Sequence, residues 1–285
     1  MKNLLFLALL VGLVACQKNV SDNVPSQPLA AQNLTDLSYG TDAAQKMDLY
    51  LPAGRSTDST KLVIMVHGGA WSTGDKTDFT PFVTTLQQRI AGCAVANMNY
   101  RLATPLANHF PVQENDMKAA IDFLVQRSGD YHISNKIILL GASSGAHMAL
   151  LQAYKNATPR VSAVVDFFGP ADMTGIYNAA APGSFNQLGI QLLMNGTPAT
   201  NASLYQQSSP LNFVSAQSPP TILLHGDADT IVNISQSTAL KAKLQSFGVA
   251  NEMDIYHNYG HDLWPTPIMN DAFDKIEAFV KANVH

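Results

Sequence analysis

The sequence is poor in cysteine and in charged residues. It has two cysteines in 285 residues, Cys16 and Cys93, which excludes the disulfide framework of small secreted domains. Charged residues make up 13% and the formal net charge is −4, with no basic stripe, so we expect no nucleic-acid partner. No internal repeat is present, which argues against a solenoid. With 46% hydrophobic residues, the chain can instead bury one large core.

The longest apolar run, residues 4–14, is too short to span a bilayer, which takes about 20 residues. It follows a short positive start and ends in Ala15-Cys16, which predicts a signal peptide over residues 1–15. This ending resembles the bacterial lipobox, and the resemblance implies a lipoprotein with lipid on Cys16. Each buried CH₂ of an acyl chain contributes about 0.8 kcal/mol to the free energy of membrane binding. We therefore expect the protein to be held to the cell envelope, at the periplasmic face of the outer membrane or at the cell surface. The alternative is an ordinary secretory peptide with an incidental cysteine.

The polar, proline-containing residues 16–35 predict a flexible linker, so we expect residues 36–285 to form the folded domain. In this domain, short apolar runs alternate with segments of helical spacing. The runs predict strands over 47–51, 62–67, 94–98, 136–140, 161–168, 221–225 and 252–256, and helices over 79–90, 112–126, 144–154, 235–247 and 267–282. This alternation predicts an α/β fold with a mostly parallel sheet and helices on both faces. Residues 171–215 lack clear periodicity and predict a lid or insertion with one short helix near 187–193.

The chemistry is concentrated around Gly141-Ala142-Ser143-Ser144-Gly145. An apolar strand precedes this segment and a helix-forming run follows it, which is the context in which G-x-S-x-G carries a nucleophile. Small neighbours let the strand and the helix approach each other, so that the Ser143 hydroxyl stands clear of the sheet. Cys93 begins a buried strand and is expected to be core filler. The alternative interpretation of residues 141–145 is a Gly/Ser turn without catalytic function that ends a buried strand.

A serine hydroxyl needs a base, and the base needs a carboxylate that orients it. Two aspartates, Asp227 and Asp229, follow the strand 221–225, and we prefer Asp229 because the turn after Gly226 gives it reach. Two histidines, His257 and His261, follow the last strand. We prefer His261 because it lies in the loop, after Gly260. His147, one turn along the helix from Ser143, is expected to pack rather than to act as the base.

Acyl transfer also needs backbone N–H donors for a negative oxygen. Ser144 supplies one donor. The glycine-rich segment His67-Gly68-Gly69-Ala70-Trp71 follows an early strand, so we assign Gly69 and Ala70 as the others, with His67 bracing the loop. A plain glycine-rich bend is the alternative.

Together these motifs, with Asn99-Tyr100-Arg101-Leu102, resemble the α/β-hydrolase superfamily. The closest resemblance is to carboxylesterases with an HGGxW oxyanion loop, which include hormone-sensitive-lipase-like, feruloyl-esterase-like and kynurenine-formamidase-like members. The resemblance implies an α/β-hydrolase fold and a buttressing role for Asn99-Tyr100-Arg101. Ser144 departs from the Ala or Gly common after the nucleophile.

We therefore expect a serine carboxylesterase that cleaves a short acyl or aryl ester through an acyl-enzyme, with an acylated carbohydrate as one candidate substrate. An amidase or peptidase with the same triad, such as an arylformamidase, is the first alternative. A lipid-anchored binding module on an inactive hydrolase fold is the second. We expect no cofactor and no metal, because no set of His, Cys and carboxylate residues shows the complete spacing of a metal-binding motif.

Overall fold

The structure is a computed structural model that describes residues 28–156 and 161–285. The predicted signal peptide, Cys16 and most of the predicted linker lie outside the described residues. Among the residues that are described, no helix is both long and apolar enough to cross a membrane.

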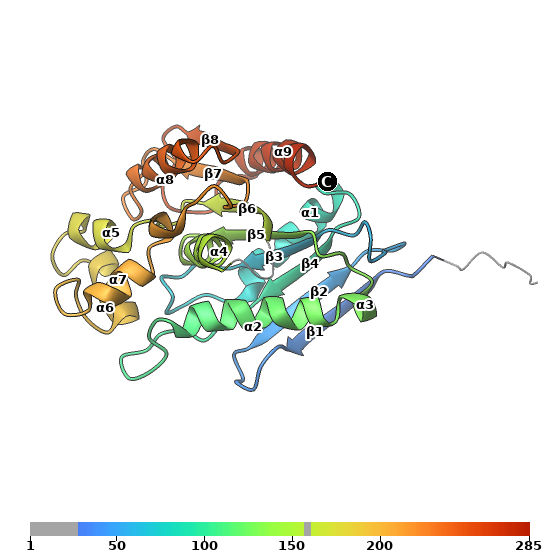
Figure 1. Ribbon diagram of the computed structural model, residues 1–285, viewed down its shortest axis with the longest axis horizontal. Helices are drawn as coiled ribbons and strands as arrows, with labels where there is room; N and C mark the ends of the chain where they lie inside the picture. The colour runs from blue at the N-terminus through green and yellow to red at the C-terminus, as the bar shows by residue number, and fades with distance from the viewer. Residues whose placement is uncertain (1–27, 157–160) are drawn as a thin grey trace, which may run out of the picture.

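Eight strands form one sheet in this part of the chain, in the order β1-β2-β4-β3-β5-β6-β7-β8 (Figure 1). β2 pairs antiparallel with β1 and with β4, and the other neighbours are parallel. The strands are β1 (Gln32–Ser38), β2 (Lys46–Leu51), β3 (Leu62–Val66), β4 (Ala94–Met98), β5 (Ile137–Ala142), β6 (Val161–Phe167), β7 (Thr221–Gly226) and β8 (Asn251–Tyr256). Every residue of β3, β4, β5 and β7 is buried, as expected for parallel strands covered on both faces.

Helices cover both faces of the sheet. On one face, α2 (Val112–Gln126), α4 (Ser144–Lys155) and α8 (Ser235–Ser246) contribute to one apolar cluster. On the other face, α1 (Val83–Arg89) and α9 (Thr266–Asn283) contribute to a second cluster. A short helix, α3 (Ser128–Tyr131), follows α2. This architecture confirms the predicted α/β class with a mostly parallel sheet.

The prediction that residues 16–35 form a linker is wrong at its C-terminal end. β1 begins at Gln32 and pairs with β2, with a register shift between Leu34 and Leu37. Most of its side chains are exposed, so the strand lacks the apolar alternation that marks a half-buried strand. The helix predicted over 79–90 also differs, because a 3₁₀ helix, η1 (Lys76–Phe82), precedes α1.

The insertion 171–215 holds more structure than the one predicted helix. It contains α5 (Met173–Ala179), α6 (Phe185–Met194), α7 (Ala202–Gln207) and the 3₁₀ helix η2 (Pro210–Phe213). Asp172 and Ser184 cap α5 and α6 by accepting hydrogen bonds from backbone N–H groups. These residue types also favour turns, which is why the sequence suggested loop. Figure 1 shows the three α-helices grouped beyond one end of the sheet.

Candidate active site

Ser143 lies at the sharp turn between β5 and α4. Its φ of 53° and ψ of −121° place it in a region that L-residues rarely adopt, and its N–H donates to the carbonyl of Phe167 at 2.9 Å. A Cβ on Gly145 would overlap the carbonyl oxygen of Val66, and one on Gly141 would overlap the backbone of Gly145. The two glycines therefore permit the close approach of strand and helix that exposes the hydroxyl.

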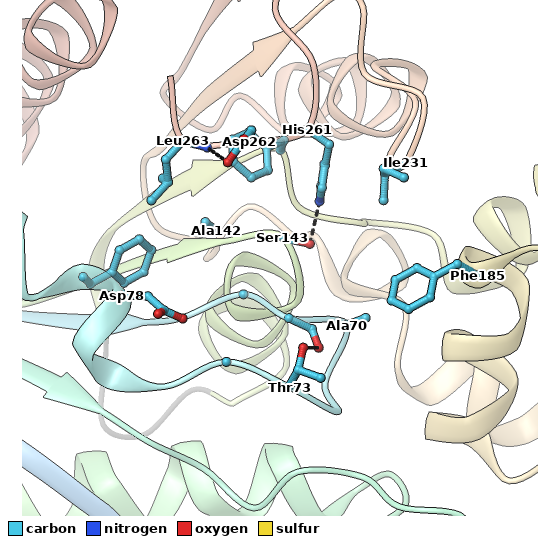
Figure 2. A pocket seen from close by; sticks show the side chains of 15 residues that line it. Ala70, Thr73, Asp78, Ala142, Ser143, Phe185, Ile231, His261, Asp262 and Leu263 are labelled. Atoms are coloured by element: carbon cyan, nitrogen blue, oxygen red, sulfur yellow. Dashed lines mark hydrogen bonds between the residues drawn. The ribbon is translucent and has the colours of Figure 1, made fainter. Parts of the chain in front are cut away.

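The structure brings Ser143, His261 and Asp229 together as predicted from the sequence. The Oγ of Ser143 lies 2.8 Å from Nε2 of His261 (Figure 2). Nδ1 of His261 lies 2.7 Å from Oδ2 of Asp229. Each side chain follows the carboxyl end of a different strand: β5, β7 and β8. An Nδ1–H that donates to Asp229 leaves Nε2 free to accept the serine proton.

The Asp229 carboxylate is buried and held by four groups. Oδ1 accepts from the N–H groups of Ile231 and Val232 at 2.8 and 2.9 Å. Oδ2 faces His261 and also lies 3.3 Å from Nε2 of His225. Burial alone would raise the pKa of Asp229, but the hydrogen bonds from His225 and His261 hold it well below its usual range. The acid is therefore ionised at neutral pH.

Asp227 and His257, the alternative candidates for the acid and the base, pair with each other instead. Nδ1 of His257 lies 2.7 Å from Oδ2 of Asp227, and both side chains face solvent. His147 is fully buried, where Nδ1 accepts from Nε1 of Trp71 at 3.1 Å and Nε2 donates to the carbonyl of Ser208 at 2.7 Å. Burial lowers the pKa of His147 to about 4, so it stays neutral and joins the glycine-rich loop to the insertion.

The glycine-rich loop is wound tightly. Gly69, Ala70 and Trp71 have φ values of 113°, 49° and 60°. Among the described loop and turn hydrogen bonds, the N–H groups of Gly69 and Ala70 donate to no backbone acceptor. Ser144 is the first residue of α4, where an N–H group has no acceptor within the helix. His67 braces this loop: its ring is buried, stacks on Tyr100 at a centroid distance of 4.4 Å, and its Nδ1 bonds the carbonyl of Gly68 at 2.7 Å.

Ser143 and His261 open into a pocket of about 570 Å³. Figure 2 shows Ile231 and Phe185 on one side of Ser143, with Asp78 and Leu263 on the other. Its lining residues come from the glycine-rich loop, η1, the elbow, α6 and the loops that follow β6, β7 and β8: Gly68, Gly69, Ala70, Thr73, Gly74, Asp78, Phe79, Ala142, Ser143, Phe168, Phe185, Ile231, His261, Asp262 and Leu263.

Three residues near the site were not singled out from the sequence. His225 contacts Asp229, and the ring of Phe168 lies 4.7 Å from that of His261. Asp166 on β6 is fully buried, and burial raises its pKa to about 7, although its Oδ1 accepts from the N–H of Gly169 at 2.7 Å. His225 and Asp166 lie next to the last residue of β7 and β6, and Phe168 directly follows β6, so only a position at a strand end could have indicated them.

Cys93 is buried as expected, and burial raises the pKa of its thiol to about 12, so the thiolate is not available at neutral pH. Within residues 28–156 and 161–285, no group of three or more His, Cys, Asp or Glu side chains is arranged to hold a metal ion.

A family model described as BD-FAE matches residues 47–244 of this chain. The chain belongs to the BD-FAE family. Because the matched region contains the glycine-rich loop, the elbow and the Asp229 loop, the match confirms the resemblance to α/β-hydrolase carboxylesterases that these motifs indicated.

Curated relatives and solved structures agree with this assignment. Esterase LipQ of Mycobacterium tuberculosis is 27% identical over 249 residues, which cover 79% of this chain and 56% of LipQ. The kynurenine formamidase of Salmo salar is 24% identical over 260 residues, covering 90% and 80% of the two chains. A truncated form of carbohydrate esterase from gut microbiota superposes with a TM-score of 0.73 at 26% identity, covering 89% and 99%. This chain therefore spans little more than half of LipQ, but nearly the whole of the truncated form of the carbohydrate esterase.

Proposed function

We propose that the protein is a serine carboxylesterase. The observation that carries the proposal is the unbroken line of hydrogen bonds from Ser143 through His261 to Asp229, which opens into a pocket beside unpaired backbone N–H groups. The esterase names of its relatives, among them LipQ, support the same reaction.

In the proposed mechanism, Oγ of Ser143 attacks the ester carbonyl while Nε2 of His261 takes the hydroxyl proton. The carbonyl oxygen becomes negative and is bound by the N–H groups of Gly69, Ala70 and Ser144. His261 then returns the proton to the leaving alcohol oxygen, and the C–O bond breaks to leave an acyl-serine. Water, deprotonated by His261, then attacks the acyl carbon. The bond from that carbon to Oγ breaks to release the acid, and His261 returns the proton to Oγ of Ser143. Asp229 stabilises the imidazolium in both halves.

The polar side chains of the pocket suit a neutral, hydroxylated alcohol. Thr73, Asp78 and Asp262 line it, and none of the described lining residues is Lys or Arg. Carboxylates accept hydrogen bonds from sugar hydroxyls and repel anionic groups. Together with the likeness to a carbohydrate esterase, this favours an acylated carbohydrate as substrate.

A phosphonate probe that labels activated serines tests the proposal. We expect labelling of the protein and hydrolysis of p-nitrophenyl acetate, and we expect both to disappear in Ser143→Ala. Ser246→Ala, which removes an exposed hydroxyl at the end of α8, should retain both. Equal labelling of Ser143→Ala and the unaltered protein would remove Ser143 from the proposed role.

A formamidase is the second candidate, favoured by the match to kynurenine formamidase. The same triad and N–H donors would serve an N-formyl amide, because only the leaving group changes from an alcohol to an amine. A kcat/KM for an aryl formamide above that for p-nitrophenyl acetate would favour this alternative.

The proposed lipid anchor is independent of the fold. It rests on the lipobox-like ending at Cys16 alone. Incorporation of labelled palmitate into the full chain in a bacterial host, and its loss in Cys16→Ser, is the expected result. Labelling that persists in the variant would contradict it.

A further inference from the structure

Ser143 contacts a second, much smaller cavity besides the open pocket. This cavity, called here the acyl cavity, has a volume of about 40 Å³. Apolar side chains form most of its wall, notably Trp71, Ile176, Phe185, Ile190 and Ile231. A site needs roughly 10–15 Å³ of such space for each water-sized group, so it accommodates about three non-hydrogen atoms.

The position of His261 decides which half of an ester enters each cavity. His261 must protonate the leaving alcohol oxygen, and it lines the open pocket but not the acyl cavity. The alcohol therefore lies in the open pocket, and the acyl chain points into the acyl cavity. Ile231 and Phe185 line both spaces, and Figure 2 shows them on one side of Ser143.

Behind the acyl cavity lies a groove of about 530 Å³ between α5 and the start of α8. Three residues line both spaces: Ile176, Asn186 and Ile231. Nδ2 of Asn186 donates to the carbonyl of Ile231 at 3.1 Å, which links α6 to the loop that carries Asp229. These residues form the partition between a cavity that holds a few atoms and a groove that could hold a long chain.

We propose that the Asn186–Ile231 bridge sets the acyl-length limit of the enzyme by separating the acyl cavity from the groove, so that chains beyond about butyryl are excluded. This inference rests on the proposed esterase function and adds its acyl specificity. To pass from the acyl cavity into the groove, a longer chain would have to displace the Ile231 side chain or break the bridge.

The test is a series of p-nitrophenyl acetate, butyrate, hexanoate and octanoate. For the unaltered protein we expect kcat/KM to fall by about 10-fold or more between butyrate and hexanoate. In the double variant Asn186→Ala/Ile231→Ala, the ratio of kcat/KM for hexanoate to that for acetate should rise by about 10-fold or more. Leu188→Ala is the matched control, because Leu188 lies on α6 with its side chain exposed and lines neither cavity. It should leave the ratio unchanged.

Three results would overturn the inference: an unaltered protein that cleaves hexanoate as fast as acetate, a double variant with an unchanged ratio and an unchanged melting temperature, or an equal change in Leu188→Ala. An unaltered protein that cleaves hexanoate as fast as acetate overturns the inference even if the double variant does not fold. Failure of the esterase proposal is distinct, because the protein would then hydrolyse no member of the series and would resist the phosphonate probe.

Discussion

Replacing Asp229 by Asn tests both the assignment of the triad acid and the physical reason for it. The carboxylate offers acceptors on both oxygens, to the N–H groups of Ile231 and Val232 on one and to His261 and His225 on the other. Asn offers one acceptor and one donor, so either orientation sets its NH₂ group against N–H donors.

The two orientations differ in cost. With NH₂ toward Ile231 and Val232, two backbone N–H groups lose their acceptor, at about 1–3 kcal/mol each. With NH₂ toward His261, that ring can shift its proton to Nε2 and accept at Nδ1. His225 then loses only its 3.3 Å contact, because its Nε2 retains the carbonyl of Val232 at 2.8 Å. The second orientation is cheaper, at about 1–3 kcal/mol.

The cheaper orientation inactivates the base. A proton on Nε2 faces Ser143 and cannot be exchanged for the serine proton. We therefore expect Asp229→Asn to fold, with its free energy of unfolding reduced by about 1–3 kcal/mol, and kcat for p-nitrophenyl acetate to fall by about 10⁴-fold. Urea unfolding and steady-state kinetics measure the two quantities.

Asp227→Asn is the matched control. Asp227 is exposed and pairs with His257 rather than with the serine site, so we expect kcat to change by less than about threefold. The reasoning is refuted if Asp227→Asn abolishes activity while Asp229→Asn retains it, or if both variants lose activity equally.

Two further predictions concern stability. Burial raises the pKa of Asp166 to about 7, above the ordinary value of 3.8, so between these pH values the folded chain binds more protons than the unfolded chain. This carboxyl should therefore lower the free energy of unfolding as pH rises from about 4 to about 7, by at most about 1.4 kcal/mol per pH unit. Urea unfolding across this range should show a smaller dependence of that free energy on pH in Asp166→Asn. An unchanged dependence would contradict the raised pKa of Asp166. Gly145→Ala should destabilise the fold by about 3 kcal/mol or more, because the added Cβ would overlap the carbonyl of Val66. Gly129→Ala is the control: nothing lies within reach of a Cβ there, so it should have little effect on the melting temperature. A Gly145→Ala variant as stable as the unaltered protein would contradict this prediction and show that the turn at Ser143 can relax.

The sequence predicted the buried strands well, because burial on both faces of a parallel sheet requires an uninterrupted apolar run. Residues 62–66 and 137–142 are such runs, and both strands are fully buried. β1 was missed for the opposite reason: it is an edge strand with mostly exposed side chains, and its pairing with β2 supplies the order that its composition does not indicate. In the insertion 171–215, α6 corresponds to the helix predicted near 187–193, whereas α5 and α7 were missed because residues such as Asp172 and Asn201 at their N-termini also favour turns.

The candidate site was predictable to the extent that its chemistry follows from chain order. Ser143, Asp229 and His261 could be chosen because each follows a strand, and the geometry separates them from Asp227 and His257, which face solvent. The contact of His225 with Asp229 could not be predicted. It depends on how β7 packs against α8, where Nδ1 of His225 bonds the hydroxyl of Ser237 at 2.7 Å.

The path of the segment after β8 determines whether the three side chains meet. In the sheet, Ala142 of β5 lies level with Phe167 of β6, and Gly226 of β7 with Tyr256 of β8. Neighbouring strands are about 4.8 Å apart, so β5 and β8 are separated by three such spacings, about 14 Å. The segment after β8 must therefore fold back over β7 and β6, and Phe168 supports the ring of His261 at 4.7 Å where it does so. The ring thus reaches Ser143 from a strand that is not adjacent to β5, with Phe168 packed against it.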